Sequence, residues 1–256
     1  MNVNTNSYTV GFACAMVVIV AALLASMSIQ LTPLQDRNIE LEKKQNILQS
    51  VGVYVDRESS ETSYSQYIKE ELVLDNQGNV LEGSAFDIDL GDELRKDIKD
   101  QKLPLYISLL EDSSKCYIIP LRGKGLWGPI WGYIALKEDV NTVFGAVFAH
   151  KAETPGLGAE INQGFFQEPF KDKKIYNSDD EFVSITVKKG GAPEGSLHDV
   201  DAISGGTITS DGVTDMLKER VGRYLPYLEK YRKAETDTTL NTNLISEVYE
   251  LSLIHI

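Results

Sequence analysis

An uncharged N-terminal segment constrains the fold of this chain more than any other feature. Residues 1–35 contain no Asp, Glu, Lys or Arg, and their apolar core runs from Tyr8 to Leu31. A helix of that length extends about 36 Å, which is enough to cross the hydrocarbon core of a bilayer. The alternative, a cleaved signal peptide, has a basic leading region and a shorter apolar core, whereas residues 1–7 contain no Lys or Arg. The sequence therefore predicts an uncleaved membrane anchor over residues 1–35.

All of the charge lies after this anchor, and it is mainly negative. The 256 residues include 25 Lys and Arg against 38 Asp and Glu, a formal net charge of -13. This balance argues against a nucleic-acid partner, because a phosphate backbone needs a basic face. The cations nearest the anchor are Arg37, Lys43 and Lys44, which are mixed with acidic residues. The positive-inside rule thus only weakly favours a cytoplasmic location for the residues after the anchor.

Cysteine usage excludes several kinds of site. Cys14 lies in the anchor and Cys116 in the part beyond it, so an internal disulfide is not expected. The sequence has no CxxC motif and no His/Cys cluster, which argues against a protein-bound iron–sulfur cluster or a structural zinc site.

Before the main apolar runs, the sequence predicts four elements. Ile39–Leu48 is expected to continue the anchor as a helix, and Arg57–Ser65 to be a loop. Residues 70–74 and 79–81 flank a turn signal at 75–78, which predicts a hairpin. A polar helix is expected over Asp92–Asp100.

Short apolar runs then predict a mainly antiparallel sheet. They are Leu105–Leu110, Cys116–Leu121, Ile130–Leu136, Val143–Ala149 and the alternating segment Phe182–Lys188. Short connections between runs favour antiparallel pairing. Two helices are expected among them, one from about Gly158 to Gln167 that ends at Pro169, and one from near Ser210 that is capped by Thr209 or Ser210.

The predicted fold class is α+β: one N-terminal transmembrane helix, then a mainly antiparallel sheet with a few helices. We divide the chain into an anchor (1–35), a membrane-proximal helix and hairpin region (36–111), a ligand-binding domain (112–233) and a loose tail (234–256). The last six residues match the translation of a common sequencing-library end, and we expect them to be an artefact.

The segment Asp201–Thr207 is the first candidate for a functional site. Five glycines between Lys189 and Gly206 allow backbone amides to approach a ligand closely. Thr207 comes about three residues before the expected helix, where free N–H groups and the helix dipole favour an anion. A phosphate on Thr207 would suit this position, although residues 205–210 can also be interpreted as only a turn and a helix cap.

Two further segments are candidates for ligand contact. Residues 153–160 lack the third glycine of the dinucleotide fingerprint, because Ile161 stands there, and they indicate a strand-to-helix turn in which the amides of Thr154 and Gly156 can face a ring or carbonyl. Residues 122–132 place Trp127 and Trp131 among glycines. A tryptophan in this setting is typical of the wall of a planar-ligand site, but Trp131 suits a core position equally well.

Together the three segments resemble the FMN-binding domain shared by the C subunit of the sodium-pumping NADH:quinone oxidoreductase and the G subunit of Rnf-type complexes. The resemblance runs from about Leu121 to Tyr227, and with the anchor it covers most of the chain up to Lys233. In that family a Ser-Gly-Ala-Thr segment carries FMN, linked through its phosphate to the threonine hydroxyl. This chain has Gly206 where the family usually has alanine, which bears on how the attachment enzyme reads the site.

The resemblance implies a role for each matching residue. Thr207 carries covalent FMN at the end of a segment that includes Gly205 and Gly206, and Asp201 and Ser204 are recognition positions for the flavin transferase that installs FMN from FAD. The flavin-contacting turn and the wall of the site comprise Glu153, Thr154, Gly156, Leu157, Gly158, Leu126 and Trp127.

The implied function is electron carriage in a sodium-pumping complex that moves electrons from NADH to ubiquinone or menaquinone. The partners are the other subunits, and the soluble part lies on the periplasmic side of the bacterial inner membrane. No independent turnover and no catalytic or metal-binding residue is expected, since His150 and His198 have no partner acids at motif spacing. The alternatives are a G-type subunit that passes electrons between ferredoxin and NAD, and a non-redox membrane-anchored binding domain with unmodified Thr207.

Overall fold

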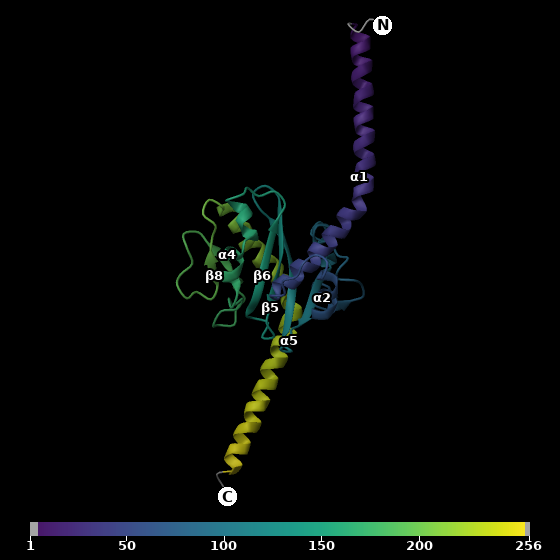
Figure 1. Ribbon diagram of the computed structural model, residues 1–256. Helices are drawn as coiled ribbons and strands as arrows, with labels where there is room; N and C mark the ends of the chain where they lie inside the picture. Colours follow the sequence, from purple (N-terminus) through teal and green to yellow (C-terminus); the bar gives the residue numbers. More distant parts are fainter. Residues whose placement is uncertain (1–4, 254–256) are drawn as a thin grey trace. The chain divides into compact units, whose positions relative to one another are not determined.

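A single long helix, α1 (Asn6–Ser50), forms the N-terminal part of the chain (Figure 1). The computed structural model describes residues 5–253, with side chains described over 5–232, so the expected loose tail (234–256) lies outside the described side chains. In the described part of the chain, α1 is the one helix long and apolar enough to cross a membrane, with a mean hydropathy of 2.5 over 18 residues. The predicted continuation over Ile39–Leu48 is confirmed, because these residues form the last turns of α1.

Two hydroxyl groups in or beside the apolar part of α1 are satisfied by the helix itself. Ser26 donates to the carbonyl of Ala22 at 2.8 Å, and Thr32 donates to that of Ser28 at 2.9 Å. Such bonds to the preceding turn remove the cost of placing an unpaired hydroxyl in hydrocarbon. The helix is therefore consistent with membrane anchoring.

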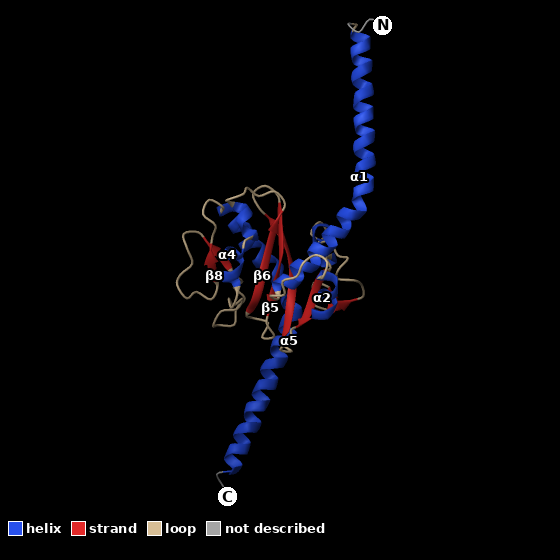
Figure 2. Cartoon of the chain, in the orientation of Figure 1, coloured by secondary structure: helices blue, strands red, loops and turns tan. Residues whose placement is uncertain are grey.

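The chain divides into two units, Met1–Lys44 and Gln45–Ile256, and the second contains a six-stranded sheet (Figure 2). Every pairing in this sheet is antiparallel, and the strand order is β2-β1-β3-β4-β5-β6. The strands are β1 (Ile68–Leu74), β2 (Val80–Leu81), β3 (Leu103–Leu109), β4 (Lys115–Lys124), β5 (Pro129–Leu136) and β6 (Val143–His150). The α+β fold class and the predicted hairpin are thus confirmed.

The expected strand over Phe182–Lys188 is only partly right. Its last three residues form β7 (Thr186–Lys188), which pairs in parallel with β8 (Asp199–Asp201) in a separate two-stranded sheet. Ser184 has a φ of 64°, a left-handed conformation that interrupts an extended strand. Of the alternating apolar residues, Ile185 and Val187 are buried, but Ser184 between them is buried as well, so the alternation holds only in part.

Both faces of the large sheet carry a core. On one face α5 (Thr207–Leu253) packs against the sheet, and its buried side chains include the predicted helical stripe of Val213, Met216, Leu217, Val221 and Tyr224. On the other face, the end of α1 and the short helix α2 (Ser60–Tyr67) contribute Ile47, Leu48 and Tyr64. The prediction of a loop over Arg57–Ser65 is therefore wrong, because burial of Tyr64 stabilises a helical turn there.

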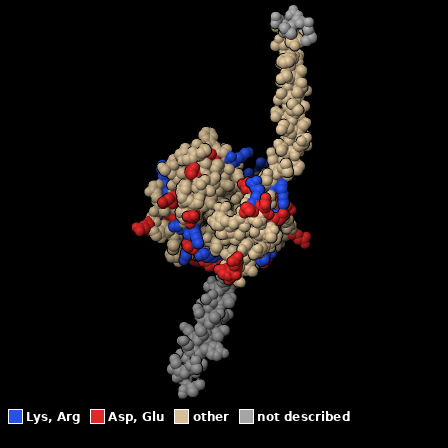
Figure 3. All heavy atoms as spheres, viewed as in Figure 1, with Lys and Arg blue, Asp and Glu red and all other residues tan. Residues whose placement is uncertain are grey.

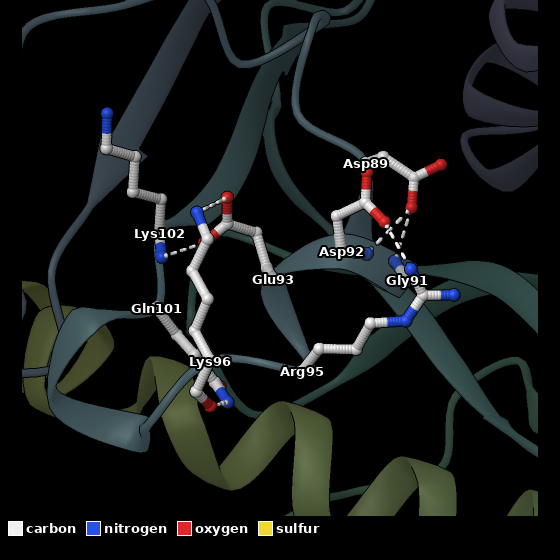
Figure 4. A network of polar contacts seen from close by, with 8 residues as sticks. All are labelled: Asp89, Gly91, Asp92, Glu93, Arg95, Lys96, Gln101 and Lys102. Atoms are coloured by element: carbon white, nitrogen blue, oxygen red, sulfur yellow. Dashed lines mark hydrogen bonds and ion pairs between the residues drawn. The ribbon is translucent and has the colours of Figure 1, made fainter.

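The polar helix predicted over Asp92–Asp100 is also wrong. Only α3 (Leu90–Glu93) and the 3₁₀ turn η1 (Ile98–Asp100) form, and a polar network holds the segment (Figure 4). Glu93 accepts hydrogen bonds from Lys96 Nζ at 2.7 Å and from the amide of Lys102 at 2.9 Å. Burial raises the pKa of the Glu93 carboxyl, but these hydrogen bonds outweigh it and leave that pKa below its ordinary value. Hydrogen bonds to the ionised Glu93 carboxylate thus hold this segment in place, where helical backbone hydrogen bonds were expected.

The helix predicted from Gly158 to Gln167 divides into three short turns. They are the 3₁₀ turn η2 (Gly158–Asn162), α4 (Gly164–Gln167) and the 3₁₀ turn η3 (Glu168–Phe170). Gln163 lies between the first two with extended backbone, at φ -91° and ψ 147°, which interrupts a continuous helix. Pro169 falls inside η3 instead of ending a longer helix.

Candidate functional site

The fold brings the three candidate segments together. They are the tip of the β4–β5 hairpin, the turn between β6 and η2, and the loop that leads from β8 into α5. The amide of Trp127 donates to Glu153 Oε1 at 2.9 Å, and the Thr209 hydroxyl donates to Glu153 Oε2 at 2.6 Å. A Cβ placed on Gly206 would lie 3.3 Å from the amide nitrogen of Gly158. Segments that are far apart in sequence therefore form one site.

Helix α5 begins at Thr207 itself, three residues before the expected start near Ser210. Gly205 precedes it with a φ of 76°, a left-handed conformation that suits glycine. The first bond of helical type runs from the amide of Ser210 to the carbonyl of Gly206, at 2.9 Å. Within residues 5–253, no acceptor bonds the backbone N–H groups of residues 207–209. The start of α5 thus presents three free amides, where the helix dipole also favours negative charge.

The predicted caps of this helix are wrong. The hydroxyl of Thr209 donates to Glu153, and that of Ser210 accepts from the amide of Ile203 at 3.2 Å. Thr214 Oγ1 accepts from the amide of Val187 at 2.9 Å. Of the four hydroxyls on the first two turns of α5, only that of Thr207 has no hydrogen-bond partner among the described residues, and the side chain is half-buried. Thr207 is therefore the hydroxyl that remains available for another group.

Four exposed apolar side chains lie on the segments that form this site. Leu126 and Trp127 on the hairpin tip are 47% and 66% exposed, and Leu157 and Ile208 are 41% and 57% exposed. Leu157 lies against Gly205, where an added Cβ would be 2.6 Å from its Cδ2 atom. Ile208 was not among the predicted site residues, because a lone apolar residue in a helix signals nothing by itself. These four residues, Leu126, Trp127, Leu157 and Ile208, are called the apolar wall below.

Trp131 lies apart from the apolar wall. It is half-buried within β5, where it pairs with Arg122 of β4 and Ala149 of β6. Of the two roles that its sequence setting allows, the structure favours a place in the sheet over a place in the site.

Glu153 is buried beneath the apolar wall and not exposed on the turn. Its side chain is only 5% exposed, and both carboxylate oxygens accept hydrogen bonds from protein groups. Burial raises the pKa of this carboxyl, but hydrogen bonds from Thr209 and the amides of Trp127 and Leu126 outweigh it and lower the pKa below its ordinary value. The site therefore contains a fixed negative charge under its wall.

Thr154, Gly156 and Leu157 of the predicted turn are exposed, whereas Gly158 is buried. The carbonyl of Thr154 accepts from the amides of Leu157 and Ala159, each at 3.1 Å, which closes the turn. The amide of Gly156, which was expected to face a ring or carbonyl, donates to Glu160 Oε1 at 2.8 Å. Among the described residues no acceptor bonds the amides of Thr154 and Gly158, so these amides and those at the start of α5 are left for a ligand.

The predicted recognition positions lie in the loop before α5. Ser204 and Gly205 are exposed, and the Asp201 carboxylate accepts from the amide of Ala192 at 2.6 Å. Asp201 thus anchors the glycine-rich loop that precedes β8. A Cβ on Gly206 would lie 3.1 Å from Ile203 Cβ and Cγ2, so the family's usual alanine needs a shift of a few tenths of an ångström.

The two histidines, predicted to have no partner acids, lie close to backbone groups. His198 Nδ1 lies 2.7 Å from the carbonyl of Lys174, and His150 Nδ1 accepts from the amide of Glu153 at 3.2 Å. His150 thus stands at the entrance of the turn, but its ring makes no contact that indicates catalysis.

The fold and this site define the class of the protein: an FMN-binding domain that follows an apolar N-terminal helix in the sequence. Residues 125–221 match the family model described as the FMN-binding domain. The chain is 30% identical over 245 residues to the C subunit of the Na(+)-translocating NADH-quinone reductase of Vibrio alginolyticus, covering 89% of this chain and 95% of that protein. The C subunit of the same reductase from Haemophilus ducreyi is 30% identical over 249 residues, covering 90% and 96%.

Solved structures agree with these relatives. The crystal structure of the C subunit of the Na(+)-translocating NADH-quinone reductase from Parabacteroides distasonis superposes with a TM-score of 0.71 at 41% identity, covering 77% of this chain and 96% of that one. The corresponding protein of Shewanella oneidensis superposes with a TM-score of 0.66 at 25% identity, covering 76% and 98%. The chain belongs to the family of C subunits of the Na+-translocating NADH-quinone reductase, and is thus one part of a larger reductase. This membership favours the C-subunit interpretation over the G-type subunit and the non-redox binding domain.

Proposed function

We propose that this protein carries electrons on an FMN whose phosphate is joined to the hydroxyl of Thr207. The observation that carries the proposal is that, among the described residues, neither the hydroxyl of Thr207 nor the amides of residues 207–209 at the start of α5 have a hydrogen-bond partner. A phosphate at this position would accept hydrogen bonds from those amides and interact favourably with the helix dipole.

The apolar wall fits the planar ring of the same group. Its four side chains are between 41% and 66% exposed, so stacking on a flavin ring would remove apolar area from water, at about 25 cal/mol per Å². A ring held on an exposed wall stays accessible to the partner subunits, and a covalent link prevents its loss to solution. When bound, FMN supplies the electron-transfer chemistry, and the chain supplies its attachment, position and electrostatic surroundings.

The attachment requires a partner, which we propose to be a flavin transferase that uses FAD. The Thr207 oxygen attacks the phosphorus of the FMN half, the phosphoanhydride bond breaks, AMP leaves and the hydroxyl proton is released. Ser204 and Asp201 are exposed beside Thr207, which supports their role in recognition by this enzyme. Gly206 lies between them and the acceptor, so it is the residue through which this chain would differ as a transferase substrate.

We also propose that the second unit, which begins at Gln45 and is called the soluble unit below, lies on the periplasmic side of a bacterial inner membrane. The resemblance to the FMN-binding family supports this side. The cations after the anchor would favour the opposite side, but Arg37 and Lys44 both form ion pairs with Glu40 at 3.3 and 2.9 Å, so they are a weak topological signal.

Flavinylation of Thr207 is directly testable. The full-length chain, co-expressed with a flavin transferase, is expected to gain the mass of one FMN less one water and to fluoresce after denaturing electrophoresis. Thr207→Ala should abolish both signals, because it removes the acceptor oxygen. Thr62→Ala is the matched control, since Thr62 is an exposed threonine of α2, outside the site.

Two outcomes would contradict the proposal in different ways. A wild-type chain that stays unmodified, beside a control substrate that the same transferase modifies, would remove the covalent cofactor altogether. Fluorescence retained in Thr207→Ala would show that another residue is the acceptor.

A further inference from the structure

We propose that Glu153 is a positioning residue, which together with the hydroxyl of Thr209 clamps the hairpin tip to the first turn of α5 and so presents Thr207 beside the apolar wall. This inference rests on the proposed attachment of FMN to Thr207. It gives Glu153 a role distinct from contact with the flavin, and it gives a role to Thr209, which no feature of the local sequence identified.

The clamp joins segments that are far apart along the chain. Trp127 precedes Glu153 by 26 residues, and Thr209 follows it by 56. Glu153 and Thr209 are only 5% and 2% exposed, so both hydrogen bonds are shielded from water. Hydrogen bonds to an ionised carboxylate are stronger than neutral ones, and a buried carboxylate that loses a donor keeps the full cost of its desolvation.

Two glycines make room for this carboxylate. A Cβ on Gly125 would lie 2.5 Å from Glu153 Oε1, and one on Gly158 would lie 2.6 Å from Oε2 and would also clash with the Thr209 hydroxyl. Gly125 belongs to the hairpin tip and Gly158 to the start of η2. The space beside these two glycines is therefore filled by the Glu153 carboxylate and the Thr209 hydroxyl, and it is not open to a ligand.

The position of the clamp explains how it acts on the site. Thr209 is two residues after Thr207 on the same helical turn, so holding its side chain fixes the orientation of that turn. The backbone of Trp127 is fixed while its ring stays exposed on the wall. Glu153 itself does not reach the surface, so its effect on a flavin must pass through these two neighbours and through the field of its charge.

The decisive variant is Thr209→Val, which keeps the shape of the side chain and removes the donor to Glu153. In the full-length, unflavinylated chain, hydrogen exchange should rise by about tenfold or more in residues 124–130 and 205–212, the effect expected from losing a hydrogen bond to a buried charge. Thr209→Ser restores the donor and should return exchange to the wild-type level. Glu194→Gln, in an exposed loop, controls for the loss of an acidic residue elsewhere.

The same variants test the consequence for the flavin. With limiting flavin transferase, Thr209→Val and Glu153→Gln should slow flavinylation by about tenfold, while Thr209→Ser and Glu194→Gln should not. In flavinylated protein, Glu153→Gln should also shift the midpoint potential upward, because removing a nearby negative charge makes reduction of the flavin easier.

The outcomes separate this inference from the proposed cofactor. If the wild type is not flavinylated, the cofactor proposal fails. The clamp is still tested in that case, because hydrogen exchange is measured on the unflavinylated chain. If the wild type is flavinylated and Thr209→Val matches it in local exchange and in flavinylation rate, the clamp is overturned. Thr209→Val could instead lower the stability of the whole chain, with no local increase in exchange and no recovery in Thr209→Ser. That result would also overturn the clamp, because it would show that Glu153 and Thr209 contribute only to packing.

Discussion

Four hydroxyls at the start of α5 illustrate how residues of similar chemistry take different roles. Thr209, Ser210 and Thr214 are hydrogen-bonded to Glu153, Ile203 and Val187, whereas Thr207 has no such partner in the part of the chain that the structure describes. Local spacing could place Thr207 after a glycine pair and before a helix. It could not show which neighbouring hydroxyls are engaged, because Glu153 is 56 residues from Thr209 along the chain. The expected caps failed for this reason: a tertiary partner competed with the helix end.

At the residue scale, Gly158→Ala should destabilise the soluble unit. The new Cβ would meet Glu153 Oε2 at 2.6 Å and would clash with the Thr209 hydroxyl, neither of which can move without breaking the clamp. Such overpacking costs about 1–3 kcal/mol of unfolding free energy. Urea denaturation of the full-length chain in detergent measures it, with Gly164→Ala as the control, because the nearest atom there is 3.4 Å away. Equal stability of the two variants would show that the site around Gly158 yields easily.

At the scale of elements, strands were predictable and short helices were not. Each strand from β3 to β6 follows an apolar run of the sequence, because both faces of the sheet are covered and burial selects apolar residues. The short helix α2 is polar, and it depends on Tyr64, whose ring packs edge-on against Phe86 and whose hydroxyl donates to Glu71 at 2.9 Å. Such partners come from later parts of the chain, so the local composition of residues 57–65 indicated a loop.

The last turns of α1 behave as part of the soluble unit, and this can be tested. Ile47 and Leu48 are fully buried in the core that includes Tyr64 and Tyr106. Ile47→Ala should lower the unfolding free energy by about 2–5 kcal/mol, the range for truncating a buried aliphatic side chain. Ile39→Ala, at a position 64% exposed, should have little effect. If urea denaturation finds the two variants equally stable, the end of α1 is not part of the core.

At the scale of the whole molecule, charge separates the two parts of the chain. Residues 1–35 carry none, and acidic and basic side chains gather on the soluble unit (Figure 3). The soluble unit has cores on both faces of the sheet, and α1 contributes to them only through its last turns, so its apolar part over Tyr8–Leu31 is free to serve as an anchor. Composition alone could establish this division. The cofactor and the reductase followed only from particular motifs and from relatives, since an acidic α+β unit on an anchor suits many functions.

The side of the membrane on which the soluble unit lies is open to a labelling experiment that the native cysteines favour. Cys116 is buried, which raises the pKa of its thiol to about 12, so it forms little reactive thiolate at neutral pH. Cys14 lies within the apolar span and is shielded from aqueous reagents once that span is in a bilayer. The wild-type chain therefore serves as its own background control.

A single cysteine introduced at exposed Glu194 should react with a membrane-impermeant maleimide in spheroplasts, if the soluble unit is periplasmic. Ser7→Cys, at the other end of the apolar span, should react only after the membrane is opened, because a single span places its two ends on opposite sides. The reverse pattern would put the flavin site in the cytoplasm. In that case the cations Arg37, Lys43 and Lys44 would have been the better guide to topology, and the flavin transferase would have to act there.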